Sequence, residues 1–327
     1  MPYQKAPNIC PVCKEEANFK FIQDYKNKWG NWSLYECSKC TVQFWLPFKN
    51  PGSDWYEDEY EYESAYLTRD IGKPRISTGQ KEFIENVKDY SQGTKALDLG
   101  CGTGDVIAEL EKRGYEVWGV ELNKNAVNFI KKCFKLKNIY GMSFDEFFKL
   151  PNLPKFDIII FFEVIEHLDN PLEFIKNASK LLKEDGIIVL STPSRERIAA
   201  NLSDWDFSPH HLTRWNEKAI SNLFKNINFK INCIYYVDRF KVIFNSLAEK
   251  FRFGLVVKTI KISKNKEISS KKSAAIKNTI LTKIVHLGAY FKDYLLFGAP
   301  AIILFLIGKI IGRKSGGMVI WLKRDVK

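Results

Sequence analysis

Short apolar runs alternate with helical patterns over the middle of the chain. The runs that predict strands lie at residues 95–99, 116–121, 139–142, 157–162 and 186–191. The segments between most of them carry apolar residues at helical spacing. Strands that alternate with helices are typical of a parallel sheet with helices on both faces. The pattern therefore predicts an α/β fold with a Rossmann-like sheet.

Two more strands are predicted near the C-terminus, at residues 229–237 and 317–323. As an antiparallel edge they would complete a seven-stranded sheet. Residues 238–316, which separate them, are then an insertion. It includes the apolar run YLLFGAPAIILFLIGKII at 294–311, which is about as long as a minimal membrane-spanning helix but contains Pro300 and Lys309.

Four of the seven cysteines form two CxxC pairs, Cys10 with Cys13 and Cys37 with Cys40. This spacing suits tetrahedral coordination of zinc, and four thiolates leave no open position for catalysis. A redox CxxC motif would lie next to a βαβ pattern, which neither pair has. We therefore predict a structural zinc-ribbon-like module over residues 1–50, followed by a connector with a cover helix over 51–92.

The first strand of the core runs into a glycine-rich turn, ALDLGCGTG at 96–104, and a helical pattern starts near Asp105. Glycines let the backbone approach a ligand closely. The spacing is GxGxG, whereas a dinucleotide fingerprint has a small residue at position 105. A carboxylate there would repel a pyrophosphate but suits a cationic ligand. Glu121 ends the next strand, where a carboxylate is expected to accept hydrogen bonds from ribose hydroxyls.

With these motifs the chain resembles the class I S-adenosylmethionine (SAM)-dependent methyltransferases, especially types 11, 12 and 23. We expect the methyltransferase core at 93–237 and its final edge strand at 317–327. The resemblance implies that the Asp98 turn holds the methionyl part of SAM, Glu121 its ribose, and the residues after the third strand its adenine. The cofactor-binding residues expected on this basis are Asp98, Gly100, Cys101, Gly102, Gly104, Glu121, Ser143, Phe144 and Phe162.

One of these positions departs from the family pattern. The family usually has Asp followed by an apolar residue where this chain has Ser143. Asp145 lies two residues further on, and it would either take over the contact to adenine or cap the following helix.

The fourth strand ends in a cluster of ionisable residues, and His210 and His211 follow the fifth strand. Such a cluster suits a general base for an acceptor hydroxyl, a divalent-cation site, or a structural role. The ExxEH motif with a later histidine resembles ubiquinone-pathway O-methyltransferases and small-RNA 3′-end 2′-O-methyltransferases. That resemblance implies catalytic or metal-binding roles, with Mg²⁺ or another divalent cation, for Glu163, Glu166, His167 and His211.

The formal charge of +12 is concentrated in one part of the chain. Residues 250–314 hold 14 Lys and Arg against only Glu267 and Asp293, and the rest of the chain holds 36 basic and 36 acidic residues. Nucleic acid as a partner would leave the apolar run at 294–311 unexplained. A basic segment beside an apolar one favours association with an anionic membrane surface, and a helix buried against the domain is the alternative.

These features predict SAM-dependent O-methylation of an amphiphilic or lipid-linked small molecule, such as a glycan or a quinone-like compound. The first thirty residues lack a secretory signal, so we expect a cytoplasmic protein at the inner membrane surface. Three alternatives remain at this point: a soluble sugar-nucleotide C-methyltransferase, an RNA 2′-O-methyltransferase, and a non-catalytic SAM-binding module tethered to the membrane.

Overall fold

The computed structural model describes residues 2–52, 55, 74–87, 94–198, 200–201, 206–238, 240, 242–244, 247 and 295–325. The acidic part of the connector at 56–66 and the basic run at 250–294 lie outside these residues. The chain divides into two compact units. The first comprises Met1–Arg195, Trp205–Val237 and Gly317–Lys327, and the second Glu196–Asp204 and Asp238–Gly316. The second unit thus takes in a short segment, 196–204, that lies outside the predicted insertion.

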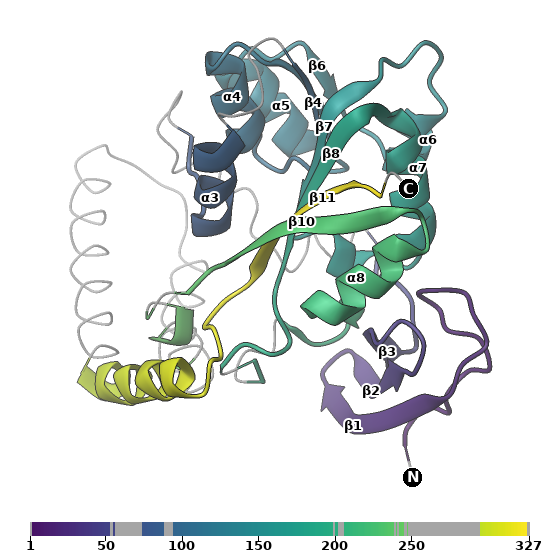
Figure 1. Cartoon of the computed structure of the whole chain (residues 1–327), viewed down its shortest axis with the longest axis vertical. Coiled ribbons are helices and arrows are strands. Elements are labelled where there is room, and N and C mark those ends of the chain that lie inside the picture. Colours follow the sequence, from purple (N-terminus) through teal and green to yellow (C-terminus); the bar gives the residue numbers. More distant parts are fainter. Residues whose placement is uncertain are drawn as a thin grey trace, which may run out of the picture. The chain divides into compact units, whose positions relative to one another are not determined.

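A seven-stranded sheet forms the centre of the first unit, with the strand order β10-β11-β8-β7-β4-β5-β6 (Figure 1). The five strands from β8 to β6 are parallel, and β11 pairs antiparallel with β8 and with β10. This sheet confirms the predicted Rossmann-like fold. Its strands are β4 (Lys95–Leu99), β5 (Glu116–Val120), β6 (Asn138–Tyr140), β7 (Phe156–Phe162), β8 (Leu182–Thr192), β10 (Phe229–Tyr236) and β11 (Met318–Arg324).

Helices cover both faces of the sheet because successive strand residues point to opposite sides. In β11, Val319 and Trp321 pack into the core on one side of the sheet, and Ile320 packs into the core on the other. One face carries α3 (Thr78–Asn86), α4 (Asp105–Lys112) and α5 (Lys124–Cys133), and the other carries α6 (Phe144–Phe148), α7 (Pro171–Leu181) and α8 (Glu217–Lys225). A short 3₁₀ helix, η2 (Ile165–His167), follows β7.

The N-terminal residues form a second, antiparallel sheet with the strand order β1-β2-β3-β9. Its strands are β1 (Phe19–Asn27), β2 (Gly30–Cys37), β3 (Gln43–Leu46) and β9 (Thr213–Arg214). The strand β9 comes from the chain segment between β8 and α8, far from β3 in the sequence. Val12 and Phe44 of the N-terminal residues belong to the same buried cluster as Phe161 of β7. The two sheets of the first unit therefore share one apolar core.

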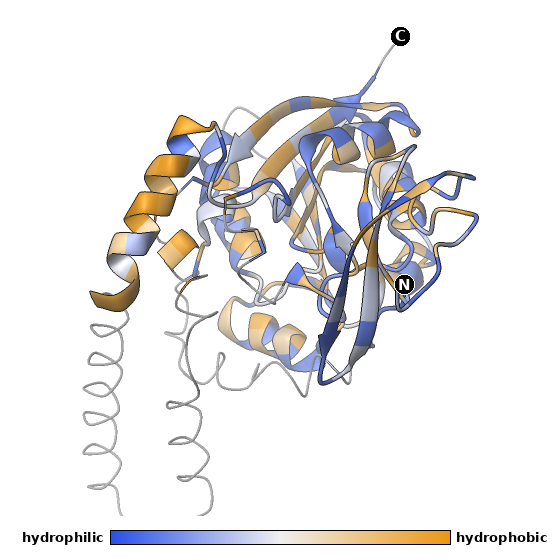
Figure 2. Cartoon of the chain, turned by 90° about the horizontal axis from the view of Figure 1, so that it is seen from below, coloured by the Kyte–Doolittle hydropathy of each residue, from blue (hydrophilic) through white to orange (hydrophobic). Residues whose placement is uncertain are grey.

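The second unit contains a helix over residues 295–310, within the apolar run (Figure 2). Ala301 on this helix is buried with Ile198, Ile243, Phe244 and Leu247. Among the described residues, no helix combines the length and the apolar character needed to cross a membrane. Large apolar side chains are nonetheless exposed along it and just after it, at Leu295, Leu296, Ile302, Ile303, Leu306, Ile307, Ile310 and Ile311.

The tight packing around β5 gives a test of the fold. A Cβ atom added at Gly119 would lie 2.9 Å from Sγ of Cys101 and 2.9 Å from Cδ1 of Ile107. We expect Gly119→Ala to lower the free energy of unfolding by about 1–3 kcal/mol, the usual cost of overpacking. Thermal and urea unfolding measure this cost.

Gly141 provides the matched control. Its added Cβ would make only ordinary contacts, 3.6 Å or more from the side chain of Val127. Gly141→Ala should therefore leave stability close to that of the unchanged protein. Equal stability of the two variants would contradict the packing described for β5.

Candidate functional site

The glycine-rich turn follows β4 and leads into α4. Its start is held to β5, since the Gly100 N–H donates to the Val120 carbonyl at 2.8 Å. Gly102 has a φ of +52°, in the left-handed region that favours glycine, and a Cβ added there would meet no atom within 4 Å. Gly102 therefore leaves open space above the turn, whereas a Cβ at Gly100 would collide with Val164 at 2.7 Å.

Glu121 follows β5 and faces this turn. One carboxyl oxygen accepts the Gly102 N–H at 2.8 Å, and the other accepts the Asn123 N–H at 2.9 Å. Burial raises the pKa of Glu121, and these hydrogen bonds from the backbone counteract the shift. Each carboxylate oxygen has more than one lone-pair site, so Glu121 retains capacity for ribose hydroxyls.

Asp98 of β4 is the second buried acid at this site. Burial raises its pKa well above the ordinary value, and the nearby charge of Glu121 adds to the shift. Two carboxyl groups at one buried site favour a cationic ligand, because positive charge offsets the cost of ionising both. The ammonium and sulfonium groups of SAM provide such charge.

A cavity of about 240 Å³ lies at the carboxyl ends of β4, β5 and β6. Gly100, Glu121, Ser143 and Phe144 of the predicted cofactor residues line it, together with Asp145. Ser143 caps α6, since its hydroxyl oxygen accepts the N–H of Glu146, and the Glu146 carboxylate accepts the Ser143 N–H. The idea that Asp145 caps this helix is therefore wrong, because the helix begins earlier, at Phe144.

Phe162 and Asp105, two further residues named in the sequence motifs, contact the segment that contains α3. Phe162, at the end of β7, packs edge-on against Phe83 of α3 with ring centroids 5.4 Å apart, and it does not line the cavity described above. Asp105 accepts the backbone N–H of Arg75 at 2.8 Å and a hydrogen bond from the Thr103 hydroxyl. Asp105 is the residue that distinguishes this turn from a dinucleotide site. Its carboxylate holds the segment before α3 near the turn.

Three histidines meet beyond the end of β7. The ligand atoms of His167, His210 and His211 all lie within 4.8 Å of one another. The His167 Nδ1 atom is 2.8 Å from the carbonyl oxygen of His210, so Nδ1–H donates and the lone pair lies on Nε2. Burial, together with the neighbouring His210, lowers the pKa of His167 to about 3. The imidazole is therefore uncharged at neutral pH.

The two glutamates of the ExxEH motif have different surroundings. Glu163 is exposed, has a left-handed φ of +56° and accepts a hydrogen bond from the Ser191 hydroxyl at 2.7 Å. Glu166 is 1% exposed, and no hydrogen bond of ordinary geometry reaches its carboxyl oxygens within the described part of the chain. Burial raises the pKa of Glu166 well above its usual range, and the charge of Glu163 adds to this. The structure thus gathers the histidines, and neither glutamate belongs to that group.

The loop that carries His210 and His211 is held from two sides. The Leu212 N–H donates to the Glu166 carbonyl at 2.8 Å, and the Leu212 carbonyl accepts the Trp45 N–H at 2.9 Å. Two side-chain amides add further hydrogen bonds. Asn50 donates to the His167 carbonyl at 2.7 Å, and Asn27 donates to the Ser208 carbonyl at 3.1 Å. The pairing of β3 with β9 follows directly after this loop.

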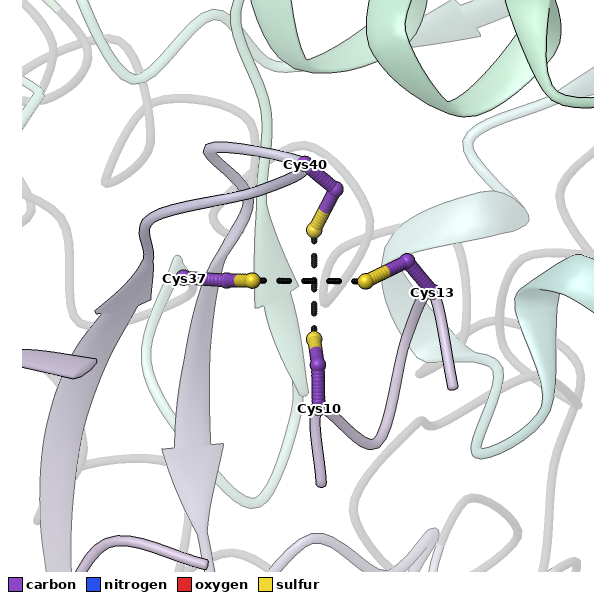
Figure 3. A group of neighbouring side chains, drawn as sticks. All are labelled: Cys10, Cys13, Cys37 and Cys40. Atoms are coloured by element: carbon purple, nitrogen blue, oxygen red, sulfur yellow. Dashed lines mark hydrogen bonds between the residues drawn. The ribbon is translucent and has the colours of Figure 1, made fainter. Parts of the chain in front are cut away.

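The four predicted cysteines converge on one point between the loop at 10–13 and the loop at 37–40 (Figure 3). Their Sγ atoms are 3.8 Å apart for Cys10 and Cys40 and 4.0 Å apart for Cys13 and Cys37. Tetrahedral zinc with Zn–S bonds of about 2.3 Å requires S–S separations of about 3.8 Å. Contact with Cys10 lowers the pKa of Cys37 and raises that of Cys40, so the thiols compete for ionisation. The geometry and the buried thiol donors fit a metal ion.

Part of the chain is similar to known methyltransferases. Residues 74–234 match the family model described as a methyltransferase domain. The ubiquinone biosynthesis O-methyltransferase of Glaesserella parasuis serovar 5 (strain SH0165) is 26% identical over 160 residues, with 45% of this chain and 62% of that protein covered. The protein of the same name from Pelagibacter ubique (strain HTCC1062) is 29% identical over 153 residues, with 44% of this chain and 62% of that protein covered. The chain thus spans less than two thirds of these relatives.

Among solved structures, that of the 4+2 cyclase SpnF is similar, with a TM-score of 0.50 and 14% identity. The similarity covers 85% of this chain and 98% of that one. It shows the fold alone, and one fold can support several reactions.

The sheet order, the glycine-rich turn after β4 and the acid after β5 are those of a class I methyltransferase fold. The family match makes the assignment specific: residues 74–234 are a class I SAM-dependent methyltransferase domain.

Proposed function

We propose that this protein transfers a methyl group from SAM to a hydroxyl group of a quinone-like, amphiphilic acceptor at a membrane surface. The observation that carries the cofactor assignment is the open turn at Gly102, bound to Glu121 beside a cavity at the strand ends. The acceptor class is taken from the relatives named ubiquinone biosynthesis O-methyltransferase, which match the same part of the chain.

We assign the cofactor roles on the geometry of this site. Glu121 binds the ribose hydroxyls, and Ser143 and Phe144 line the adenine part of the cavity. The turn residues Gly100 to Gly104 hold the methionyl part, and Asp98 supplies the negative charge that favours its ammonium group. Phe162 has a supporting role, because its ring packs against α3.

The transfer is an in-line displacement. The acceptor oxygen bonds to the methyl carbon while the bond from that carbon to the sulfonium sulfur breaks, and S-adenosylhomocysteine leaves. The hydroxyl proton goes to a base. His167 is uncharged at neutral pH and offers a lone pair on Nε2, but its pKa of about 3 makes it a weak base. Positioning of the two reactants therefore supplies much of the acceleration, and a cation near the hydroxyl would assist its ionisation.

The N-terminal cysteines bind structural zinc in this proposal. Four buried thiols at tetrahedral separations fill the coordination sphere, which leaves no site for a substrate. The bound ion stabilises the sheet β1-β2-β3-β9, and through β9 it supports the histidine loop.

The helix at 295–310 is the proposed contact with the membrane. Ile303 is 57% exposed and Ile310 is 83% exposed, which is unusual for isoleucine on a soluble surface. The sequence next to this helix carries the excess of basic residues. Each Lys or Arg near an anionic membrane surface contributes about 1 kcal/mol to the binding free energy. A helix that lies in the membrane interface accounts for both the exposed isoleucines and the neighbouring basic residues.

Binding of SAM tests the cofactor site. We expect Gly102→Asn to weaken SAM binding by about tenfold or more, because the new side chain fills the open space above the turn. Isothermal titration calorimetry measures the affinity. Gly114→Asn is the matched control, since Gly114 also has a positive φ, +87°, and an open Cβ position. Asparagine tolerates this backbone region, so both variants should fold.

The same pair of variants tests the reaction. With labelled SAM and a prenylated catechol, the unchanged protein and Gly114→Asn should place label in the organic phase, and Gly102→Asn should not. Label that enters only water-soluble sugars or RNA would contradict the proposed acceptor. SAM binding without label in any acceptor would contradict catalysis.

Metal analysis tests the zinc site. The purified protein should contain one equivalent of zinc at the cysteine cluster, and Cys37→Ser should lose most of it and unfold at lower temperature. Cys133→Ser is the control, because Cys133 lies outside the four-cysteine group. Full zinc content in Cys37→Ser would rule out coordination by this residue.

Vesicle binding tests the membrane contact. Full burial of an isoleucine side chain is worth about 1.5–3 kcal/mol, so Ile303→Ser combined with Ile310→Ser should reduce binding to phosphatidylglycerol vesicles by about tenfold or more. Sedimentation with the vesicles measures the bound fraction. Leu122 of the first unit is 61% exposed, and Leu122→Ser should leave vesicle binding unchanged. Unchanged binding of the double variant would leave charge as the only attraction.

A further inference from the structure

The hairpin of β1 and β2 reaches the loop that carries two of the clustered histidines. The side-chain amide of Asn27 donates to the Ser208 carbonyl at 3.1 Å, and its side-chain oxygen accepts the Trp29 N–H at 2.9 Å. The ring of Tyr25 meets that of Phe207 edge-on, with centroids 4.8 Å apart. The tip of the hairpin is therefore fixed to the histidine loop.

A series of rings leads from this tip to the histidines. The rings of Trp29 and Trp55 meet edge-on with centroids 5.5 Å apart. The Trp55 ring is tilted against the His210 ring, with centroids 6.2 Å apart. The chain between β3 and Trp55 is anchored at the same place, because Asn50 donates to the His167 carbonyl at 2.7 Å. Three segments that are distant in the sequence thus place their rings next to one another.

Trp29 differs from the other tryptophans of the N-terminal sheet in its exposure. Trp32 and Trp45 are 6% and 0% exposed, and they pack with Phe207 in a buried cluster. Trp29 is 43% exposed and belongs to none of the buried clusters that the described residues form, although tryptophan is highly buried on average. Lys28 lies over its ring, with Nζ 4.2 Å from the centroid. A large ring that is held in place without filling the core provides a surface for a ligand.

The series of rings ends beside the cofactor cavity. The His210 ring meets that of His167, the last residue of η2, edge-on at 4.9 Å. Val164 and Leu168, on either side of η2, line the cavity. An acceptor has to place its hydroxyl at the methyl group of bound SAM, while the rest of the acceptor lies outside the space that SAM fills. Apolar surface next to η2 is therefore where the rest of an apolar acceptor gains binding energy.

We propose that Trp29 and Trp55 bind the aromatic ring of the acceptor and so help to determine which acceptors are methylated. This inference rests on the proposed methyl transfer to a quinone-like compound. A flat ring packs favourably on an indole in an offset-stacked or an edge-on arrangement. The apolar faces of the two tryptophans suit such a ring better than a charged sugar nucleotide.

The proposal gives the N-terminal residues a part in substrate selection. Trp29 and Trp55 both lie outside residues 74–234, which match the methyltransferase family. The cysteine cluster holds the same hairpin at its other end, because Cys37 is the last residue of β2, and Gly30, its first, directly follows Trp29. The methyltransferase domain thus supplies the cofactor site, and the N-terminal module adds an aromatic wall for the acceptor.

Steady-state kinetics with labelled SAM and a water-soluble catechol that carries a single prenyl unit provide the test, because such an acceptor requires no membrane. We expect Trp29→Ala to raise the KM for the catechol by about tenfold, through loss of one aromatic contact. The kcat should stay within about twofold and the SAM affinity should not change, since Trp29 contributes to acceptor binding alone. Trp29→Phe keeps a ring and should recover part of the KM increase.

Phe21→Ala is the matched control. Phe21 is also 43% exposed and lies on β1, but its ring packs edge-on against Tyr35. This variant should have the KM and kcat of the unchanged protein. Zinc content and thermal unfolding show that all variants are folded.

The outcomes separate this inference from the proposed reaction. If the unchanged protein methylates the catechol and Trp29→Ala has the same KM, or loses kcat alone, the tryptophan site is overturned and the reaction stands. An equal rise of KM in Phe21→Ala would also overturn the site. If the unchanged protein labels a sugar nucleotide or RNA and no catechol, the proposed reaction is overturned, and the inference with it.

Discussion

The pairing of β3 with β9 is the constraint on which the candidate site depends. Gln43 and Phe44 of the N-terminal sheet pair with Arg214 and Thr213, which follow the histidine loop directly. Arg195, after β8, reinforces this connection, because its guanidinium donates to the Thr41 carbonyl at 2.6 Å and lies 3.3 Å from the Glu36 carboxylate. The N-terminal sheet therefore supports the histidine loop through β9 and Arg195.

Buried acids at the strand ends are the second feature on which the candidate site depends. Asp98, Glu121 and Glu166 are acids at or near the carboxyl ends of parallel strands, and burial raises the pKa of each. A parallel sheet concentrates such groups at one edge, where ligands bind in open α/β folds. Burial makes ionisation of these acids costly, and a cationic ligand at the site offsets that cost.

Local patterns in the sequence were sufficient to predict the sheet. All seven strands lie within a few residues of the predicted ranges, because apolar runs bounded by glycine and polar residues mark buried strands. The cysteine cluster was also predictable from spacing alone. In contrast, β9 is two residues long, and its partner β3 is distant in the sequence, so no local pattern marks it. For the same reason the sequence did not distinguish His210 from the glutamates as a member of the cluster. The cap of α6 was marked locally, because Ser143 and Glu146 have the S-x-x-E spacing of a capping box.

The order of the sheet has a consequence for synthesis on the ribosome. β10 reaches the sheet only through β11, which pairs with β8 on its other side. The chain emerges with β10 first, then residues 238–316, and only then β11. Until Met318 to Arg324 are made, the edge of β8 stays open and β10 has no partner in the sheet. The apolar and basic insertion is therefore complete, and available to a membrane, before the enzyme domain can close.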